Sequence, residues 1–283
     1  MSIKVENLSH VFDKGTVMET YAFKDVSFEI KDGSFTGVIG HTGSGKSTLI
    51  QHLNGLLKPD SGTVYYNGED IFAEKYNMKA LRGQVGLVFQ YPEYQLFEEN
   101  VLKDVMFGPL NMGASEAEAR EKALNAIRMT GLSDDICGRN PFDLSGGQKR
   151  RAAIAGVLAM EPRVLILDEP TAGLDPKGRD EILDTVAELN KKKLITIILV
   201  SHSMEDIARY ADMLLVMNKG ALQYYDTPKN VFAHAAELEK MGLSVPEVTK
   251  IAGDLKEAGI DIDTSVSTVE EAKREILRIW RKK

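Results

Sequence analysis

A glycine-rich stretch leaves few folds open to this chain: Gly40-His41-Thr42-Gly43-Ser44-Gly45-Lys46-Ser47-Thr48. It matches the P-loop pattern G-x-x-x-x-G-K-[ST], whose glycines allow a tight turn that aims backbone N–H groups at phosphate oxygens. Lys46 can reach the β- and γ-phosphates, and the Ser47 hydroxyl can bind Mg²⁺. The apolar run 35–39 predicts a buried strand before the loop, and residues 46–54 predict a helix after it. This context favours a nucleotide site over a chance glycine-rich turn.

Composition excludes several classes of protein. The chain has 283 residues and 43% hydrophobic content, enough for one large domain with or without a smaller piece. A net charge of −7 argues against sequence-independent nucleic-acid binding, so no nucleic-acid partner is expected. Cys137 is the single cysteine, which fits a reducing compartment. The start of the chain lacks an apolar signal core and no apolar run is long enough to span a membrane. We therefore expect any membrane role to come through a partner.

Polar side chains directly follow three further apolar runs that we predict to be buried strands. The runs and their following residues are 85–89 with Gln90, 164–167 with Asp168-Glu169, and 194–200 with His202. In an open parallel sheet, ligands lie beyond the carboxyl ends of the strands. Asp168 then fits a Mg²⁺-holding carboxylate, and Glu169 can orient and deprotonate the attacking water. The alternative is a solvated pair of acids in a loop.

Residues from about 91 to 160 are predicted to form a helical subdomain inserted into the α/β core. Ser145, Gly146, Gly147 and Gln148 precede a strong helix-forming stretch, so their backbone N–H groups could face an anion. Alone, such a helix start is weak support for a site. The segment 91–97 is aromatic and interrupted by Pro92, and is either a packed surface turn or a docking site.

The two ends of the chain carry further predictions. Residues 3–8 and 22–30 predict strands, and Phe12 follows the first of them as either a core residue or a base-stacking residue. Strands are also predicted at 213–217 and 221–225. Ser244 and Thr268 are predicted to cap two helices in the tail. The second of these has an apolar stripe that comprises Val269, Ala272, Ile276 and Ile279. Because a tail of this size cannot bury much by itself, we expect the tail to pack on the main domain or on another subunit.

Taken in order, these motifs resemble those of the ABC-type ATPases. The matching segments are the P-loop 40–48, Gln90, the signature 144–148, the Walker B run 167–170, the D-loop 173–175 and His202. The resemblance covers residues 1–225. It implies an α/β P-loop NTPase (RecA-like) core with an antiparallel β-subdomain, the inserted helical subdomain, and a small C-terminal helical domain at 226–283.

The resemblance also implies roles for individual residues. It implies a dimer in which each ATP lies between one subunit's P-loop and the other's signature residues, Ser145, Gly146, Gly147 and Gln148. Phe12 would stack on adenine, and Gln90 would sense Mg²⁺ and the γ-phosphate. His202 would contact the γ-phosphate, and Asp175 would communicate between the subunits.

Three segments are more specifically similar to the ATPases of energy-coupling factor (ECF) transporters, and especially to the second ATPase of each pair. The segments are 88–97, 150–162 and 245–248. This similarity implies ATP-driven uptake of vitamins or transition-metal ions by a complex on the cytoplasmic face of the membrane. The implied partners are a second similar ATPase, in a heterodimer or a homodimer, a membrane coupling subunit, and a substrate-binding membrane subunit.

Two other functions share the same catalytic motifs. One is a non-transport ABC ATPase that acts on DNA or ribosomes, but no long heptad run lies between Lys46 and Ser145, and only one cassette is present. The other is the ATPase of a lipid or drug exporter, from which only the 91–97 loop and the C-terminal tail distinguish this chain.

Overall fold

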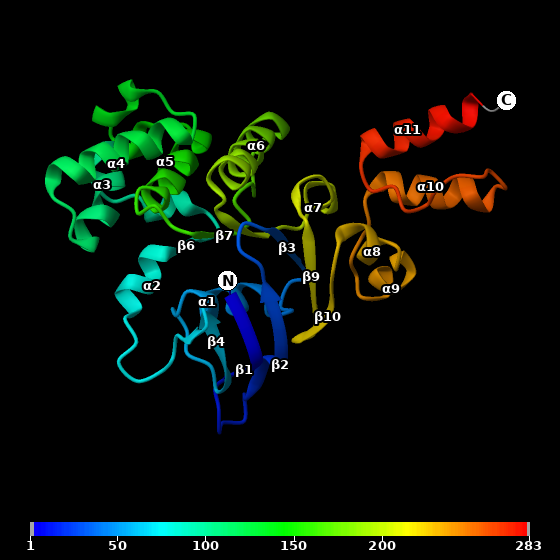
Figure 1. Ribbon diagram of the computed structural model, residues 1–283, viewed down its shortest axis with the longest axis horizontal. Coiled ribbons are helices and arrows are strands. Elements are labelled where there is room, and N and C mark those ends of the chain that lie inside the picture. The colour runs from blue at the N-terminus through cyan, green and yellow to red at the C-terminus, as the bar shows by residue number, and fades with distance from the viewer. Residues whose placement is uncertain (1–2, 282–283) are drawn as a thin grey trace.

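Two β-sheets form the centre of the structure, a computed structural model that describes residues 3–281 (Figure 1). The first is antiparallel, with the strand order β2-β1-β4-β5. Its strands are β1 (Ile3–Phe12), β2 (Thr20–Ile30), β4 (Ser61–Tyr66) and β5 (Glu69–Asp70). The second has the order β10-β9-β3-β8-β7-β6 and is parallel except for its last hairpin, β9 and β10. Its strands are β3 (Phe35–Ile39), β6 (Val85–Val88), β7 (Val164–Asp168), β8 (Thr196–Val200), β9 (Met213–Asn218) and β10 (Ala221–Asp226).

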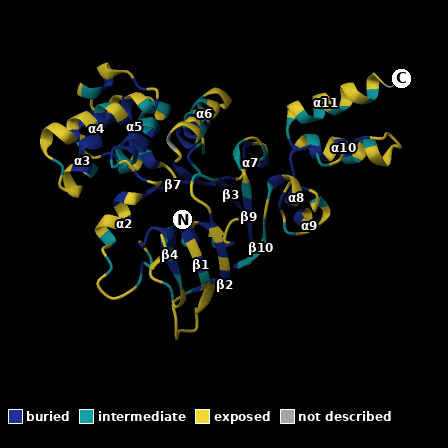
Figure 2. Cartoon of the chain, in the orientation of Figure 1, coloured by how far each residue is buried: buried dark blue, intermediate teal, exposed yellow. Residues whose placement is uncertain are grey.

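The central strands of the second sheet are buried along their whole length, which explains their continuous apolar sequences. Side chains alternate between the two faces of a strand. Leu165 and Leu167 accordingly join a core with the helices on one side, whereas Val164 and Ile166 join a core with the antiparallel sheet on the other. Figure 2 shows both cores as buried ribbon around β3, β7 and β9. The fold class predicted from the sequence is confirmed.

Helices α1 to α7 surround the sheets. Their bounds are α1 (Lys46–Leu53), α2 (Met78–Gln84), α3 (Val101–Met112), α4 (Glu116–Met129), α5 (Gly146–Leu158), α6 (Pro176–Lys193) and α7 (Met204–Tyr210). Helices α3, α4 and α5 form a separate group beside the sheet (Figure 1). The 3-10 turn η1 (Pro92–Gln95) lies between β6 and α3, and the turns η2 (Asp134–Gly138) and η3 (Pro141–Asp143) lie between α4 and α5. Segment 91–160 therefore consists of helices and turns, as its sequence indicated.

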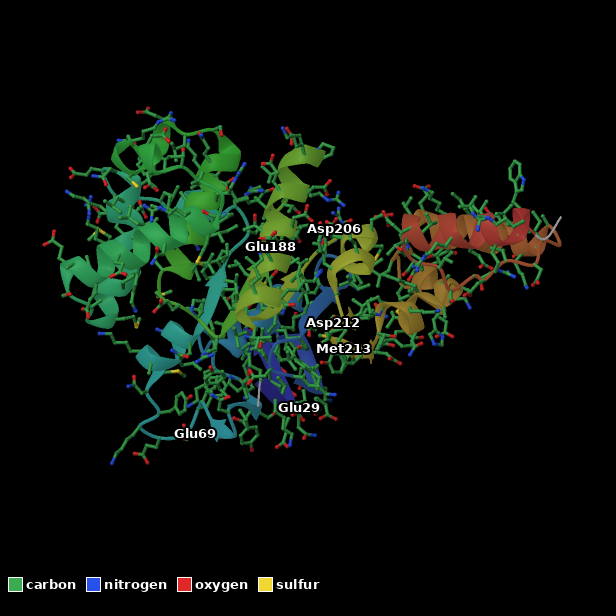
Figure 3. All side chains as sticks on the ribbon, turned by 45° about the horizontal axis from the view of Figure 1, so that its top comes forward. Glu29, Glu69, Glu188, Asp206, Asp212 and Met213 are labelled. Carbon is green, nitrogen blue, oxygen red and sulfur yellow. The ribbon has the colours of Figure 1, made fainter. Side chains whose placement is uncertain are left out.

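A side-chain contact sets the start of β3. Asp212, in the turn between α7 and β9, accepts a hydrogen bond from the Phe35 backbone N–H at 2.9 Å. Asp212 is labelled in Figure 3 beside Met213, the first residue of β9. Because β9 and β8 flank β3 in parallel, this contact helps to align the strand that leads into the P-loop.

As far as residue 281, the C-terminal tail forms four helices. They are α8 (Pro228–Phe232), α9 (Ala235–Lys240), α10 (Glu247–Glu257) and α11 (Val269–Trp280). Thr268 caps α11 as predicted, through a capping box with Glu271. Ser244 does not cap α10; that prediction is wrong, because the helix begins after Pro246, and a residue before proline avoids the helical conformation. Residues 1–2 and 282–283, the outer ends of the two predicted domains, lie outside the described residues.

The apolar stripe of α11 packs on its own neighbour and is only partly covered. Ala272 and Ile279 contact a small core of Ala252, Ile262 and Val266. Val269 and Ile276 stay exposed, and Figure 2 shows α11 as exposed and intermediate ribbon. The tail itself packs on the main domain, as expected, through α8 and α9: Val231, Phe232 and Leu238 belong to the core on the helical side of the sheet.

Candidate active site

The P-loop joins β3 to α1 and is held in shape by the lysine it carries. Lys46 Nζ donates hydrogen bonds to the carbonyl oxygens of Gly40 at 2.6 Å and His41 at 3.2 Å. The side chain is only 6% exposed, and burial lowers the pKa of Lys46, against the attraction of Glu169 and Asp168. The loop thus holds a buried cation where the sequence placed a phosphate contact.

Gly45 shows why the loop requires glycine. Its φ is +97°, and a Cβ there would lie 2.5 Å from the carbonyl oxygen of Ala22 on β2. The antiparallel sheet is therefore seated directly against the P-loop. Any side chain at this position would force the two apart.

Three predicted side chains meet at the carboxyl ends of β6, β7 and β8. The Glu169 carboxylate lies at their centre. Its Oε2 accepts a hydrogen bond from Gln90 Nε2 at 2.9 Å, and its Oε1 lies 2.8 Å from His202 Nε2. Glu169 has φ +48°, a left-handed conformation that non-glycine residues rarely adopt. The convergence expected from the strand ends is present.

Asp168 and Ser47 provide a donor set that fits Mg²⁺. Asp168 is buried, its Oδ1 has no hydrogen-bond partner, and burial raises its pKa, while a hydrogen bond with Ser47 lowers it. Within residues 3–281, no cluster of three or more His, Cys, Asp or Glu side chains could hold a metal alone. One carboxylate and one hydroxyl suit Mg²⁺, which usually completes its shell with substrate phosphates and water.

Phe12 lies at the end of β1, opposite Thr20 of β2. The residue is 45% exposed, so it is not a core residue, and its ring meets His10 edge-on with 4.8 Å between centroids. Thr20 lies two positions before Ala22, whose carbonyl oxygen borders Gly45, so the end of β1 that carries Phe12 lies near the P-loop.

The signature residues and Asp175 are not brought to this chain's own P-loop. Ser145 and Gln148 form a capping box at the start of α5, which leaves the amides of Gly146 and Gly147 without partners in the helix. Helix α5 lies in the helical group, to one side of α1 (Figure 1). Asp175 is the N-cap of α6, and its Oδ1 accepts from the Gly178 N–H at 2.6 Å.

Segment 91–97 is held by a buried side chain that the sequence analysis did not predict. Asp104 Oδ2, on α3, accepts hydrogen bonds from the backbone N–H groups of Phe97 at 2.9 Å and Glu98 at 2.8 Å. Asp104 is buried among apolar residues of α3, and an acid on an apolar helix face could have signalled this role. The aromatic side chains of the segment stay exposed; Tyr94 is 86% exposed.

Comparison with known proteins identifies the class. The model of the ABC transporter family matches residues 23–172. The chain is 57% identical to an energy-coupling factor transporter ATP-binding protein, EcfA2, of Caldanaerobacter subterraneus subsp. tengcongensis, over 99% of this chain and 98% of that protein. It is 54% identical to the EcfA2 protein of Clostridium tetani, over 100% of this chain and 99% of that protein. The chain belongs to the ABC transporter ATP-binding proteins and, within them, to the energy-coupling factor group.

Solved structures agree with this assignment. The structure of cbiO1 from Clostridium perfringens, described as part of the ABC transporter complex cbiONQ, has a TM-score of 0.75 and 42% identity, covering 90% of this chain and 98% of that one. The cassette MJ0796, in a dimeric post-hydrolysis state bound to ADP and Pi, has a TM-score of 0.72 and 29% identity, covering 80% and 98%. Along residues 3–281, no helix is long and apolar enough to cross a membrane.

Proposed function

We propose that this chain is the ATP-hydrolysing motor of an ECF-type importer, and that Glu169 is its general base. The observation that carries the proposal is the contact of Glu169 with both Gln90 and His202 at the strand ends beside the P-loop. A carboxylate held between an amide and an imidazole can take a proton from water while His202 stabilises charge that develops on the γ-phosphate.

The other site residues bind and orient ATP. The backbone amides of residues 40–48 and the Lys46 ammonium hold the phosphates, and the Phe12 ring stacks on adenine. Asp168, Ser47 and Gln90 would hold Mg²⁺, which when bound neutralises charge on the phosphates. The buried and unpaired Oδ1 of Asp168 supports this assignment.

A second, similar ATPase completes each ATP site in this proposal. Ser145, Gly146, Gly147 and Gln148 lie away from their own P-loop, where they can bind the partner's ATP; the amides of Gly146 and Gly147 have no partners within the helix, whereas those of Ser145 and Gln148 are bonded in the capping box. Asp175 would communicate between the two subunits. The groove between α10 and α11, about 350 Å³ with lining that includes Ile251, Leu255 and Ile276, gives the C-terminal helices an apolar face for the same partner. Residues 226–283 would then act as the dimerisation domain.

Segment 91–97, which we call the docking segment, is the proposed contact with the membrane coupling subunit. Beside it lies a groove of about 270 Å³ whose lining includes Phe97, Phe107, Met112, Val157 and Met160. Exposed aromatic residues next to an apolar groove are typical of interface hot spots. Through this subunit, the ATPase would drive a substrate-binding membrane subunit that takes up a vitamin or a transition-metal ion, and would itself stay peripheral, on the cytoplasmic face.

Reconstitution tests the whole proposal. The chain is co-expressed with candidate ECF subunits, purified from membranes, and placed in lipid vesicles with ATP on the ATPase side. Uptake of labelled substrate together with phosphate release is the expected result. Phosphate release by a chain that assembles with exporter subunits, and with no ECF subunit, would favour the exporter alternative.

A further inference from the structure

One buried side chain, Arg150, joins three segments that lie far apart in the sequence. Arg150 lies on α5, two positions after Gln148, and is 3% exposed. Its Nη2 donates to Glu93 Oε1 at 3.0 Å and its Nε to Glu93 Oε2 at 3.2 Å. Its Nη1 donates to the carbonyl oxygen of Ala172 at 2.6 Å.

Each partner belongs to a segment with a role in the proposed function. Glu93 is part of the docking segment, three positions after Gln90. Ala172 lies in the loop 169–175, which begins at Glu169 and ends at Asp175. The helix that carries Arg150 begins with the signature. A single guanidinium therefore links the docking segment, the signature helix and the loop that carries the general base.

Arginine suits this position for a geometric reason. Its planar fork presents donors in several fixed directions, so one side can hold a carboxylate while another reaches a carbonyl. A lysine ammonium is a compact point charge that does not reproduce both contacts. Arg151, next in the chain, pairs instead with Glu181 on α6, so the three-segment link belongs to Arg150 specifically.

We propose that Arg150 is a positioning residue that holds the docking segment and the loop 169–175 to the signature helix as one mechanical unit. A movement of the loop 169–175 at the ATP site then moves the docking segment with it as a rigid body. The link itself is a property of the fold, and its use in transport rests on the proposed function. Such a shared element is what energetic coupling between two sites requires.

Amide hydrogen exchange tests the link directly, on the full-length protein without nucleotide. Arg150→Lys should raise the exchange rate in peptides covering both 91–97 and 169–175, by about tenfold or more, because each loses a charge-assisted contact. Glu93→Gln is the milder second variant and should raise exchange in both peptides as well, because Arg150 loses its anchor. The matched control is Arg128→Lys, which alters the two-bond Arg128–Asp134 pair on the surface of the same helical group.

The proposal that the three segments move as one unit would be wrong if exchange stayed unchanged in both peptides. It would also be wrong if both variants raised exchange in the same single peptide and left the other unchanged. A rise in the Arg128→Lys protein of the same size would contradict it too, since any loss of an ion pair would then suffice.

Turnover separates positioning from simple stability. With the assembled transporter, Arg150→Lys should lower kcat about ten- to a hundredfold while the KM for ATP changes less than threefold, because the P-loop is untouched. The double variant Glu93→Gln with Arg150→Lys should have a kcat no lower than that of the slower single variant, because both changes break the same contact. Additive losses, or a normal kcat, contradict the proposal. A wild-type protein without turnover would instead contradict the proposed function, and the exchange comparison would still decide the link.

Discussion

Glu169 and His202 meet where β7 and β8 end, with 2.8 Å between Glu169 Oε1 and His202 Nε2. The Glu169 backbone N–H also donates to the carbonyl oxygen of Val200, so Glu169 is fixed to the neighbouring strand. A carboxylate fixed in this way keeps its position while water and γ-phosphate change around it. The first two predictions follow from this pair.

Glu169→Gln should abolish turnover and leave ATP binding intact. Glutamine keeps the shape and the contact with Gln90 but cannot accept a proton from water. Loss of a general base typically costs about 10²–10⁴ in rate. Phosphate release and equilibrium ATP binding are the measurements. A variant with normal turnover would remove Glu169 from the mechanism.

His202→Ala should lower turnover more than nucleotide affinity. Its proposed contact strengthens as charge develops at the γ-phosphate, and removing such a contact costs about 10²–10³ in kcat. The test compares kcat with the dissociation constants of ATP and ADP. Equal losses of ATP and ADP binding with unchanged kcat would show a structural histidine.

Phe12→Ala should weaken ATP binding about 5- to 150-fold, because stacking on a base is worth about 1–3 kcal/mol. Phe12→Tyr should bind normally and serves as the matched control. Titration of both proteins with ATP is the measurement. Since Phe12 is exposed at the end of β1, both proteins should unfold at the wild-type temperature. Loss of stability without loss of affinity would contradict the stacking role.

Tyr94→Ala combined with Phe97→Ala should spare folding and ATP binding but uncouple hydrolysis from uptake. Both side chains are exposed, so their removal leaves the core intact. Hot-spot truncations cost about 2 kcal/mol or more, or at least about thirtyfold in partner affinity. Pull-down of the coupling subunit and uptake in vesicles measure the effect. Wild-type assembly and uptake by the double variant would leave the segment as ordinary surface.

Asp104→Ala should reduce the free energy of unfolding by about 1–3 kcal/mol, because it leaves the amides of Phe97 and Glu98 unpaired. Asp104→Asn keeps an acceptor and should cost less. Burial raises the pKa of Asp104, so the folded protein binds this proton more tightly than the unfolded chain does. Its contribution to stability is therefore present below its ordinary pKa of about 3.8 and is lost as the pH rises through the folded value.

Urea unfolding across this pH range tests the assignment. Asp104→Asn should flatten the dependence of stability on pH above about 3.8, since asparagine does not titrate. If the free energy of unfolding of Asp104→Asn changed with pH as steeply as that of the wild type, groups other than Asp104 would cause the pH dependence.

Local patterns in the sequence predicted the P-loop, the buried strands at 35–39 and 164–167, and the cap of α11 at Thr268. Each depends on residues a few positions apart, whose conformation and burial follow from side-chain size, polarity and spacing. The ends of parallel strands also meet by geometry, so the group of Gln90, Glu169 and His202 could be predicted without the fold.

Only the tertiary structure decided the contacts between residues far apart in the chain. Arg150 reaches Glu93 and Ala172, which lie 57 and 22 positions away, and Gly45 borders Ala22 on another sheet. The start of α10 depended on Pro246 rather than on Ser244, and the α11 stripe packed on α10. Such contacts depend on how elements pack in space, and a guanidinium or a glycine has many possible neighbours until that packing is known.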